Sequence, residues 1–328
     1  MKNKKKWLLL LQAVLVIACV AGVLVPKLTN GSRPVKVTLV MKTDASVAEY
    51  WEVMLKGVQE ATADYNVDLT VTGASAETEI DEQIQVMSDV IQEDPDVVVL
   101  VSSDFHQMAA STEAAVAAGI PVITMDSDVN SAARTCYIGS DNYEIGSAMG
   151  ELLCEKLPEG GKVAILAQSA NSSAGIDRSR GAEDVVTRSG RNELVGIYYC
   201  DNDVVRAAEI TREIMAQHGD LAAIICTNEV CNVGAANYVA SLDGSREIIL
   251  IGCDSSMAQI SYLERDIIQG IVVQQPFNMG YVAIRSAVQL VRGEDLDAQI
   301  EIPCVSITKE NMYEKENQKL LFPFNGST

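Results

Sequence analysis

Residues 120–128 read Ile-Pro-Val-Ile-Thr-Met-Asp-Ser-Asp, a short apolar run rich in β-branched residues that ends in carboxylates. This pattern predicts a buried strand of a parallel sheet whose carboxyl end opens into a crevice. Three later stretches, 224–229, 248–254 and 270–276, repeat the pattern and also end in polar residues. Any one of these polar residues could simply cap the helix that follows it. Because open α/β sheets bind ligands beyond the carboxyl ends of their strands, the four together favour one site for a ligand rich in hydroxyl groups.

The chain has 328 residues and a formal net charge of -20. This length exceeds that of one compact core and predicts two domains. Residues 1–33 hold six of the 25 Lys and Arg residues and no acid, so the rest has 19 basic against 45 acidic residues, a net charge of -26. A body this acidic would repel phosphate backbones, which disfavours nucleic acid as a partner.

The N-terminal region predicts export and attachment to a membrane. Four lysines lie within residues 1–6, and residues 7–25 carry no charge. A positive flank before about 19 apolar residues is typical of an export signal whose basic end stays in the cytoplasm. Residues 16–19, Val-Ile-Ala-Cys, resemble a lipobox with Cys19 as the acylated residue, but the residues that follow are apolar, which favours an uncleaved anchor. Both alternatives place the protein on the outer face of the bacterial cytoplasmic membrane.

The other cysteines predict neither a disulfide framework nor a metal site. There are seven of them beyond Cys19, an odd number, and several lie in predicted strands, which favours a role as small buried side chains. Cys226 and Cys231 lack a second ligand pair at zinc-site spacing, so no metal or other cofactor is expected. The seven are Cys136, Cys154, Cys200, Cys226, Cys231, Cys253 and Cys304.

Strands and helices alternate along the rest of the chain, which predicts parallel sheets with right-handed crossovers. A first unit has predicted strands at 35–43, 67–73, 97–101 and 120–125 and helices at 47–65, 79–93 and 108–118. A second unit has predicted helices at 143–157, 177–189, 204–218, 230–242, 257–265 and 277–292, strands at 162–167, 194–199, 222–227, 248–253 and 270–274, and an extended pair near 299–307. The fold class is therefore α/β, with two doubly wound parallel-sheet domains and a cleft between them.

Several of these stretches together resemble a known family. The order and spacing of residues 50–57, 120–126, 137–142, 178–181, 227–229, 252–254 and 274–276 resemble the type I periplasmic sugar-binding proteins, in particular the ribose-, galactose- and allose-binding branch that supplies ABC importers. The resemblance extends from about residue 35 to residue 312. It implies a monomer with a three-strand hinge whose crossings lie near 139–142, 274–276 and Pro303.

The chain is expected to have three parts: an N-terminal segment and two lobes that are separated at the hinge positions. Residues 1–33 are the signal or membrane anchor and linker. The N-terminal lobe is expected to comprise 34–139 and 276–302, and the C-terminal lobe 140–275 and 303–328.

The resemblance also implies a set of ligand-binding residues. Tyr50 and Trp51 would lie on the faces of a sugar ring, although Trp51 could instead be part of the core and Arg178 part of a surface salt bridge. Carboxylates accept hydrogen bonds, a guanidinium donates them and amides do both, as a ring of hydroxyls requires. The ribose binders have an arginine where this chain has Ser127, so ribose itself is not implied. The residues expected to bond the hydroxyls are Asp126, Arg178, Asn228, Asp254 and Gln274.

Enzymatic function is not predicted. The chain has two histidines, His106 and His218, and no G-x-S-x-G motif, which leaves little from which to build a hydrolase triad. Gly160-Gly161-Lys162 precedes a strand rather than following one, and no G-x-G-x-x-G follows the first strand. The predicted function is capture of a small sugar or polyol for an ABC permease. The alternative is a membrane-anchored binder that reports its ligand to a sensor kinase or chemoreceptor.

Overall fold

The computed structural model describes residues 33–242, 244 and 246–322. Across this part of the chain, no helix is both long enough and apolar enough to span a bilayer. The predicted apolar anchor and Cys19 lie outside the described residues, as do the last six residues assigned to the C-terminal lobe.

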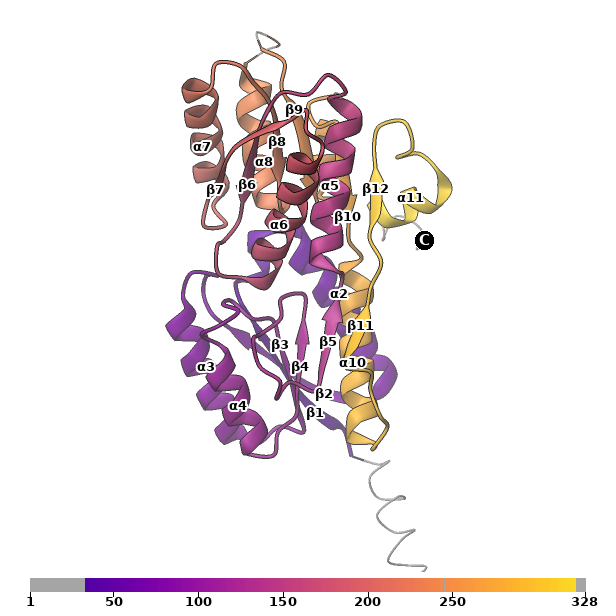
Figure 1. Ribbon diagram of the computed structural model, residues 1–328. Helices are drawn as coiled ribbons and strands as arrows, with labels where there is room; N and C mark the ends of the chain where they lie inside the picture. Colours follow the sequence, from indigo (N-terminus) through magenta and orange to yellow (C-terminus); the bar gives the residue numbers. More distant parts are fainter. Residues whose placement is uncertain (1–32, 243, 245, 323–328) are drawn as a thin grey trace, which may run out of the picture.

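Two six-stranded sheets form the centres of two α/β domains (Figure 1). The first domain has the strand order β11-β5-β4-β3-β1-β2 and the second β12-β10-β9-β8-β6-β7. Every pairing in the first sheet is parallel, and in the second only β12 runs antiparallel, to β10. The predicted fold class is thereby confirmed. The strands are β1 (Val35–Met41), β2 (Val67–Gly73), β3 (Val97–Leu100), β4 (Val122–Met125), β5 (Cys136–Gly139), β6 (Lys162–Ala167), β7 (Glu193–Tyr199), β8 (Leu221–Cys226), β9 (Ile249–Cys253), β10 (Gly270–Val273), β11 (Gln299–Glu301) and β12 (Val305–Ile307).

Helices connect the strands and cover the sheets. They are η1 (Ala45–Val47), α2 (Glu49–Tyr65), α3 (Ile80–Glu93), α4 (Ala109–Ala117), α5 (Asn142–Lys156), α6 (Ser173–Arg188), α7 (Val204–Gln217), α8 (Glu229–Ser241), α9 (Met257–Glu264), α10 (Pro276–Val291) and α11 (Lys315–Leu321).

Strand β5 was not predicted, and two helices differ from the prediction by more than their last residues. Helix α6 begins at Ser173, four residues before the predicted start, because the Ser172 hydroxyl accepts a hydrogen bond from the backbone N–H of Gly175 at 3.2 Å and caps the helix there. The short helix α11 was not predicted, since seven mostly polar residues give little helical periodicity.

Late segments of the chain return to the first domain. Helix α10 packs against α2, and β11 pairs with β5, so that both lie beside elements from the first half of the chain (Figure 1). The contact between α10 and α2 is close: a Cβ at Gly57 would lie 2.0 Å from the carbonyl oxygen of Phe277, and one at Gly280 would lie 2.3 Å from that of Met54. Glycine at both positions therefore allows the two helix backbones to touch.

We expect Gly57→Ala to lower the free energy of unfolding by about 1–3 kcal/mol, because the added methyl group forces α10 away from α2. Chemical denaturation measures this change. The control is Gly219→Ala, where a Cβ meets nothing within 4 Å, and its effect should stay within about 0.5 kcal/mol. Equal stabilities for the two variants would contradict the close packing of these helices.

Candidate functional site

Two aspartates occupy equivalent positions in the two domains. Asp126 directly follows β4 and Asp254 directly follows β9, and these strands hold the same place in their sheets. The backbone N–H of each donates at 2.9 Å to the neighbouring strand, to the carbonyls of Ile138 and Val272. Both aspartates also have left-handed backbone conformations, with φ of 64° and 74°. Such conformations are uncommon for residues other than glycine and are concentrated at functional sites.

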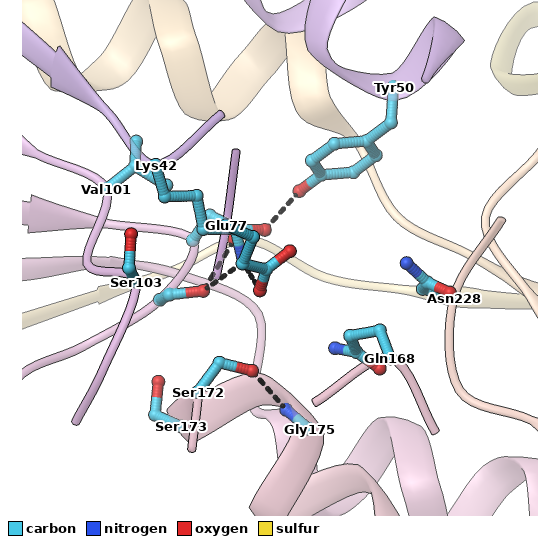
Figure 2. A network of polar contacts seen from close by, with 12 residues as sticks. Lys42, Tyr50, Glu77, Val101, Ser103, Gln168, Ser172, Ser173, Gly175 and Asn228 are labelled. Atoms are coloured by element: carbon cyan, nitrogen blue, oxygen red, sulfur yellow. Dashed lines mark hydrogen bonds and ion pairs between the residues drawn. The ribbon is translucent and has the colours of Figure 1, made fainter. Parts of the chain in front are cut away.

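All seven predicted ligand-binding side chains line one cavity of about 30 Å³ between the domains. The cavity lies at the carboxyl ends of both sheets, as expected for open α/β folds. Figure 2 shows part of it, with Lys42, Tyr50 and Glu77 from the first domain and Gln168 and Asn228 from the second. The complete lining is Lys42, Ala48, Tyr50, Trp51, Glu77, Asp126, Gln168, Ala174, Arg178, Asn202, Asn228, Glu229, Asp254 and Gln274.

The first domain contributes a buried lysine with several partners. The Lys42 Nζ atom lies 2.9 Å from Glu77 Oε1 and 3.7 Å from Asp126 Oδ2, and it donates to Ser127 Oγ at 3.0 Å. It also lies 5.3 Å from the centre of the Trp51 ring, within cation–π range. A cation from the end of β1 thus reaches Ser127, the residue that replaces an arginine in the ribose-binding pattern.

Tyr50 and Trp51 lie in the first turn of helix α2 and belong to both the cavity and the core. The Tyr50 hydroxyl donates to Asp126 Oδ1 at 2.7 Å. Burial, with the nearby Asp126 and Asp254 carboxylates, raises the pKa of Tyr50 well above its ordinary value, so this hydroxyl stays a neutral donor. Trp51 packs edge-on against Tyr50 with a centroid distance of 4.9 Å, and it is 5% exposed. Trp51 therefore packs in the core and also lines the cavity.

The second domain contributes a buried arginine. Arg178 is 3% exposed, which excludes the surface salt bridge considered above. Its Nε atom donates to Asn142 Oδ1 and its Nη1 atom to the carbonyl of Thr227, both at 2.9 Å.

Asp254 and Asn228 complete this side of the cavity. The Asp254 carboxylate accepts from Gln274 Nε2 at 2.6 Å and from the backbone N–H of Glu229 at 2.9 Å. Burial raises the pKa of Asp254, although Arg178 opposes this shift. Asn228 caps helix α8 through its Oδ1 atom and donates from Nδ2 to Asn202 Oδ1 at 2.8 Å.

Five polar residues of the cavity were not predicted. Two follow strands directly: Lys42 after β1 and Gln168 after β6. Asn202 lies just beyond the end of β7, and Glu77 in the loop after β2. Selecting polar residues just beyond the carboxyl end of every strand, as was done for residues 120–128, would have found these four residues. Glu229 was part of the stretch 227–229 but was not selected, because nothing in the sequence showed that its partners lie in the other domain.

Glu229 joins the two domains by capping a helix across the cleft. The backbone N–H groups of Glu49 and Tyr50 donate to its Oε1 and Oε2 atoms at 3.3 Å and 3.2 Å. Ala48, the N-cap of α2, has no side chain that could do this. In return, the Glu49 carboxylate accepts from the backbone N–H of Met257, the first residue of α9, at 3.0 Å. Each domain therefore satisfies helix donors of the other.

Further bonds close the domains on the opposite side of the cavity. The backbone N–H of Asp128 donates to Ser173 Oγ at 2.7 Å, and that of Phe105 donates to the carbonyl of Asn171 at 2.9 Å. The cavity of about 30 Å³ has room for about two water molecules. A larger ligand therefore needs movement of the lining side chains or of the domains.

The described cysteines are free thiols. Five of the seven are buried, as predicted, whereas Cys154 and Cys304 are half-buried. Among the described residues, no group of three or more His, Cys, Asp or Glu side chains is arranged to hold a metal ion.

The fold and cavity agree with comparisons to known proteins. Residues 37–295 match the family described as "Periplasmic binding protein domain", and the chain belongs to this family. The ribose import binding protein of Bacillus subtilis is 22% identical over 84% of this chain and 89% of its own. The D-allose-binding periplasmic protein of Escherichia coli is 20% identical over 78% of this chain and 85% of its own.

Two solved structures have the same fold. A carbohydrate transporter solute-binding protein from Agrobacterium radiobacter, in complex with D-arabinose, has a TM-score of 0.85 and 24% identity, with 88% of this chain and 99% of that chain covered. GanP, a glucose-galactose binding protein from Geobacillus stearothermophilus, has a TM-score of 0.80 and 27% identity, with 86% and 100% covered.

Glu229 should make the stability of the closed protein depend on pH. Burial, reinforced by Asp254, raises its pKa from 4.5 to about 7. The protonated form is therefore favoured in the closed protein. The stability that protonated Glu229 gives to the closed protein is complete below about pH 4.5 and is lost as the pH rises through about 7. Glu229→Gln keeps an acceptor oxygen without the charge, so this variant should melt roughly 2–6 °C above the wild type at pH 8.

At pH 5 the two proteins should melt within about 1 °C of each other, since most Glu229 is then protonated. Thermal unfolding at both pH values provides the measurement. Glu52→Gln, on the exposed side of the same helix α2, removes one charge outside the cavity and serves as the control. A constant difference between Glu229→Gln and the wild type across this range would contradict the assignment.

Proposed function

We propose that this protein is an extracytoplasmic solute-binding protein that captures a small sugar or similar polyhydroxylated ligand between its two domains and delivers it to an ABC importer. The observation that carries the proposal is the convergence of aromatic, charged and amide side chains from both domains on one cavity. A site divided between two domains couples binding to domain closure, because a ligand that contacts both halves favours the closed state.

The chemistry of the cavity suits a ring of hydroxyls. Asp126 and Asp254 supply acceptors, Arg178 and Lys42 supply donors, and Gln274 supplies both. In the closed structure these groups bond one another, as in the pairs Tyr50 with Asp126 and Gln274 with Asp254. We propose that ligand hydroxyls replace these internal partners when the domains close around a sugar. Buried polar groups then remain satisfied with ligand in the site.

The relatives support a sugar as the ligand and import as the role. Their names specify ribose import and allose binding, and GanP, at 27% identity, is a glucose-galactose binding protein. No observation favours the alternative of a binder that reports to a sensor kinase or chemoreceptor.

We propose that the domains open about the three crossings predicted from the sequence, near 139–142, 274–276 and Pro303. The lobes would then comprise 34–139 with 276–302 and 140–275 with 303–328. The division of the strands between the sheets supports these boundaries, since β11 pairs in the first sheet and β12 in the second. The packing of α10 against α2 supports them too, because α10 begins at Pro276.

We also propose that the exported protein works as a monomer tethered to the membrane. The basic flank and the apolar run of residues 7–25 support an uncleaved anchor, with a lipid on Cys19 as the alternative attachment. Either form would keep the binding domains close to a permease in the same membrane.

A thermal-shift screen of pentoses, hexoses and polyols against residues 30–328 should yield at least one stabilising sugar. Calorimetry with that sugar then tests the site. Arg178→Ala and Asp254→Ala should each weaken binding roughly 10- to 100-fold, because removing one partner from a buried, charged hydrogen bond costs about 1.5–3 kcal/mol.

The matched control for these variants is Asp104→Asn. Asp104 is a buried aspartate that caps the first turn leading into α4 and does not line the cavity. This variant should lower the melting temperature and leave the affinity unchanged. Arg178→Ala and Asp254→Ala variants that lose stability but bind the sugar as well as the wild type does would overturn the proposed binding role.

Fractionation of cells that express the full chain tests the tether. We expect the wild-type protein in the membrane fraction, since about 19 apolar residues suffice to cross a bilayer. An uncleaved anchor keeps the Cys19→Ala variant there as well, whereas release of this variant alone establishes attachment by a lipid. Recovery of the wild type as a free soluble protein refutes the tether in both forms.

A further inference from the structure

Two buried cysteines lie in contact in the second domain. The Sγ atoms of Cys200 and Cys231 are 3.3 Å apart, and both residues have 0% exposure. Cys200 follows the end of β7, and Cys231 is the third residue of α8. Disulfide formation requires the two sulfurs to approach to about 2.05 Å. A shift of little more than 1 Å in flexible side chains would achieve this.

We propose that Cys200 and Cys231 form a disulfide bond when the protein matures outside the cytoplasm, and that this bond fastens loop 200–203 to the start of helix α8. The proposal relies on the extracytoplasmic location, because disulfides persist in oxidising compartments and are rare in the cytoplasm.

The two segments that the bond would join carry residues of the sugar cavity. Asn202 lies two residues after Cys200, and Asn228 lies three residues before Cys231. They bond each other at 2.8 Å through Asn228 Nδ2 and Asn202 Oδ1. The backbone N–H of Cys231 also donates to Asn228 Oδ1 at 3.0 Å. The sulfur pair is therefore next to an asparagine pair that lines the cavity.

The backbone of loop 200–203 has an unfavourable conformation that a disulfide at Cys200 would help to hold. Asp201 and Asn202 are consecutive residues with left-handed conformations, with φ of 53° and 57°. Two such residues in succession cost conformational energy that the surroundings must offset. A covalent bond at Cys200 would reduce the number of conformations open to the unfolded chain between residues 200 and 231.

Formation of the bond proceeds by thiol–disulfide exchange, in which a thiolate attacks a sulfur of a disulfide. One thiolate attacks a disulfide oxidant, either a small molecule or an oxidoreductase, forms a mixed disulfide and releases one thiol. The second thiolate then displaces the other thiol. Two cysteine thiols lose two protons and two electrons, and the oxidant disulfide takes them up to give two thiols.

Burial sets the time at which this exchange occurs. With both sulfurs inaccessible in the folded domain, an oxidant reaches them only before loop 200–203 closes over α8. The bond should form during folding after export and then resist reductants until the domain unfolds.

The test uses the full chain, recovered after export into an oxidising bacterial periplasm and denatured in N-ethylmaleimide. Intact mass should show two fewer maleimide groups than the same protein reduced with dithiothreitol before labelling. Glutamyl endopeptidase then identifies the pair, because cleavage after Glu229 separates Cys226 from Cys231. We expect fragment 194–209 joined to fragment 230–247. Equal labelling with and without reduction, or a bond to fragment 214–229, would overturn the assignment.

Variants and thermal unfolding complete the test. In Cys231→Ser the difference of two labels should vanish, whereas Cys154→Ser, at a half-buried cysteine outside the pair, should retain it. The oxidised protein should melt roughly 5–10 °C above protein refolded under reducing conditions, because the bond closes a loop of about 30 residues. Identical melting temperatures would refute the fastening role. No sugar is present in these measurements, so their outcome is independent of the ligand proposal.

Discussion

The carboxylate of Glu229 holds the first turn of a helix in the other domain, and the geometry of the cavity depends on this contact. Ala48, the N-cap of helix α2, provides no side-chain cap, so the first N–H groups of the helix need an acceptor from elsewhere. Because Tyr50 and Trp51 lie in that first turn, the acceptor that satisfies the helix also places both rings over the cavity. The protein thus supplies a side-chain cap to this helix only where the two domains are in contact.

Closure also brings more carboxylates than cations into the cavity. Four carboxylates from Glu77, Asp126, Glu229 and Asp254 face the cations of Lys42 and Arg178. The excess is reduced by proton uptake at Glu229, because burial raises its pKa to about 7. Burial raises the pKa of Asp254 as well. A protonated carboxyl group donates a hydrogen bond as well as accepting one. The closed site consequently offers both donors and acceptors to a ligand, and its balance between them changes with pH.

The alternation of strands and helices was sufficient to predict most strands of both sheets, because a parallel strand buried on two faces leaves a continuous apolar run such as 120–125. Strand β5, which has only four residues, was missed. The same reasoning located Asp126 and Asp254 at strand ends, and all seven selected side chains line the cavity. Contacts between distant residues were beyond this reasoning. Nothing near Glu229 in the sequence indicates its bonds to α2, and nothing near Cys200 indicates the sulfur of Cys231. Helix α11 was missed for a different reason, since it is too short to show a period.

The two halves of the cavity share a backbone plan but differ in charge. Lys42 follows β1 as Gln168 follows β6, and these strands hold equivalent places in their sheets, as do those preceding Asp126 and Asp254. The first domain places an ammonium group beside its aspartate, whereas the second has an amide at the corresponding strand end. A ligand turned end for end would therefore meet an amide where it had met a charge. Since charged hydrogen bonds are stronger than neutral ones, these two strand ends differ chemically even though the strand order around them is the same.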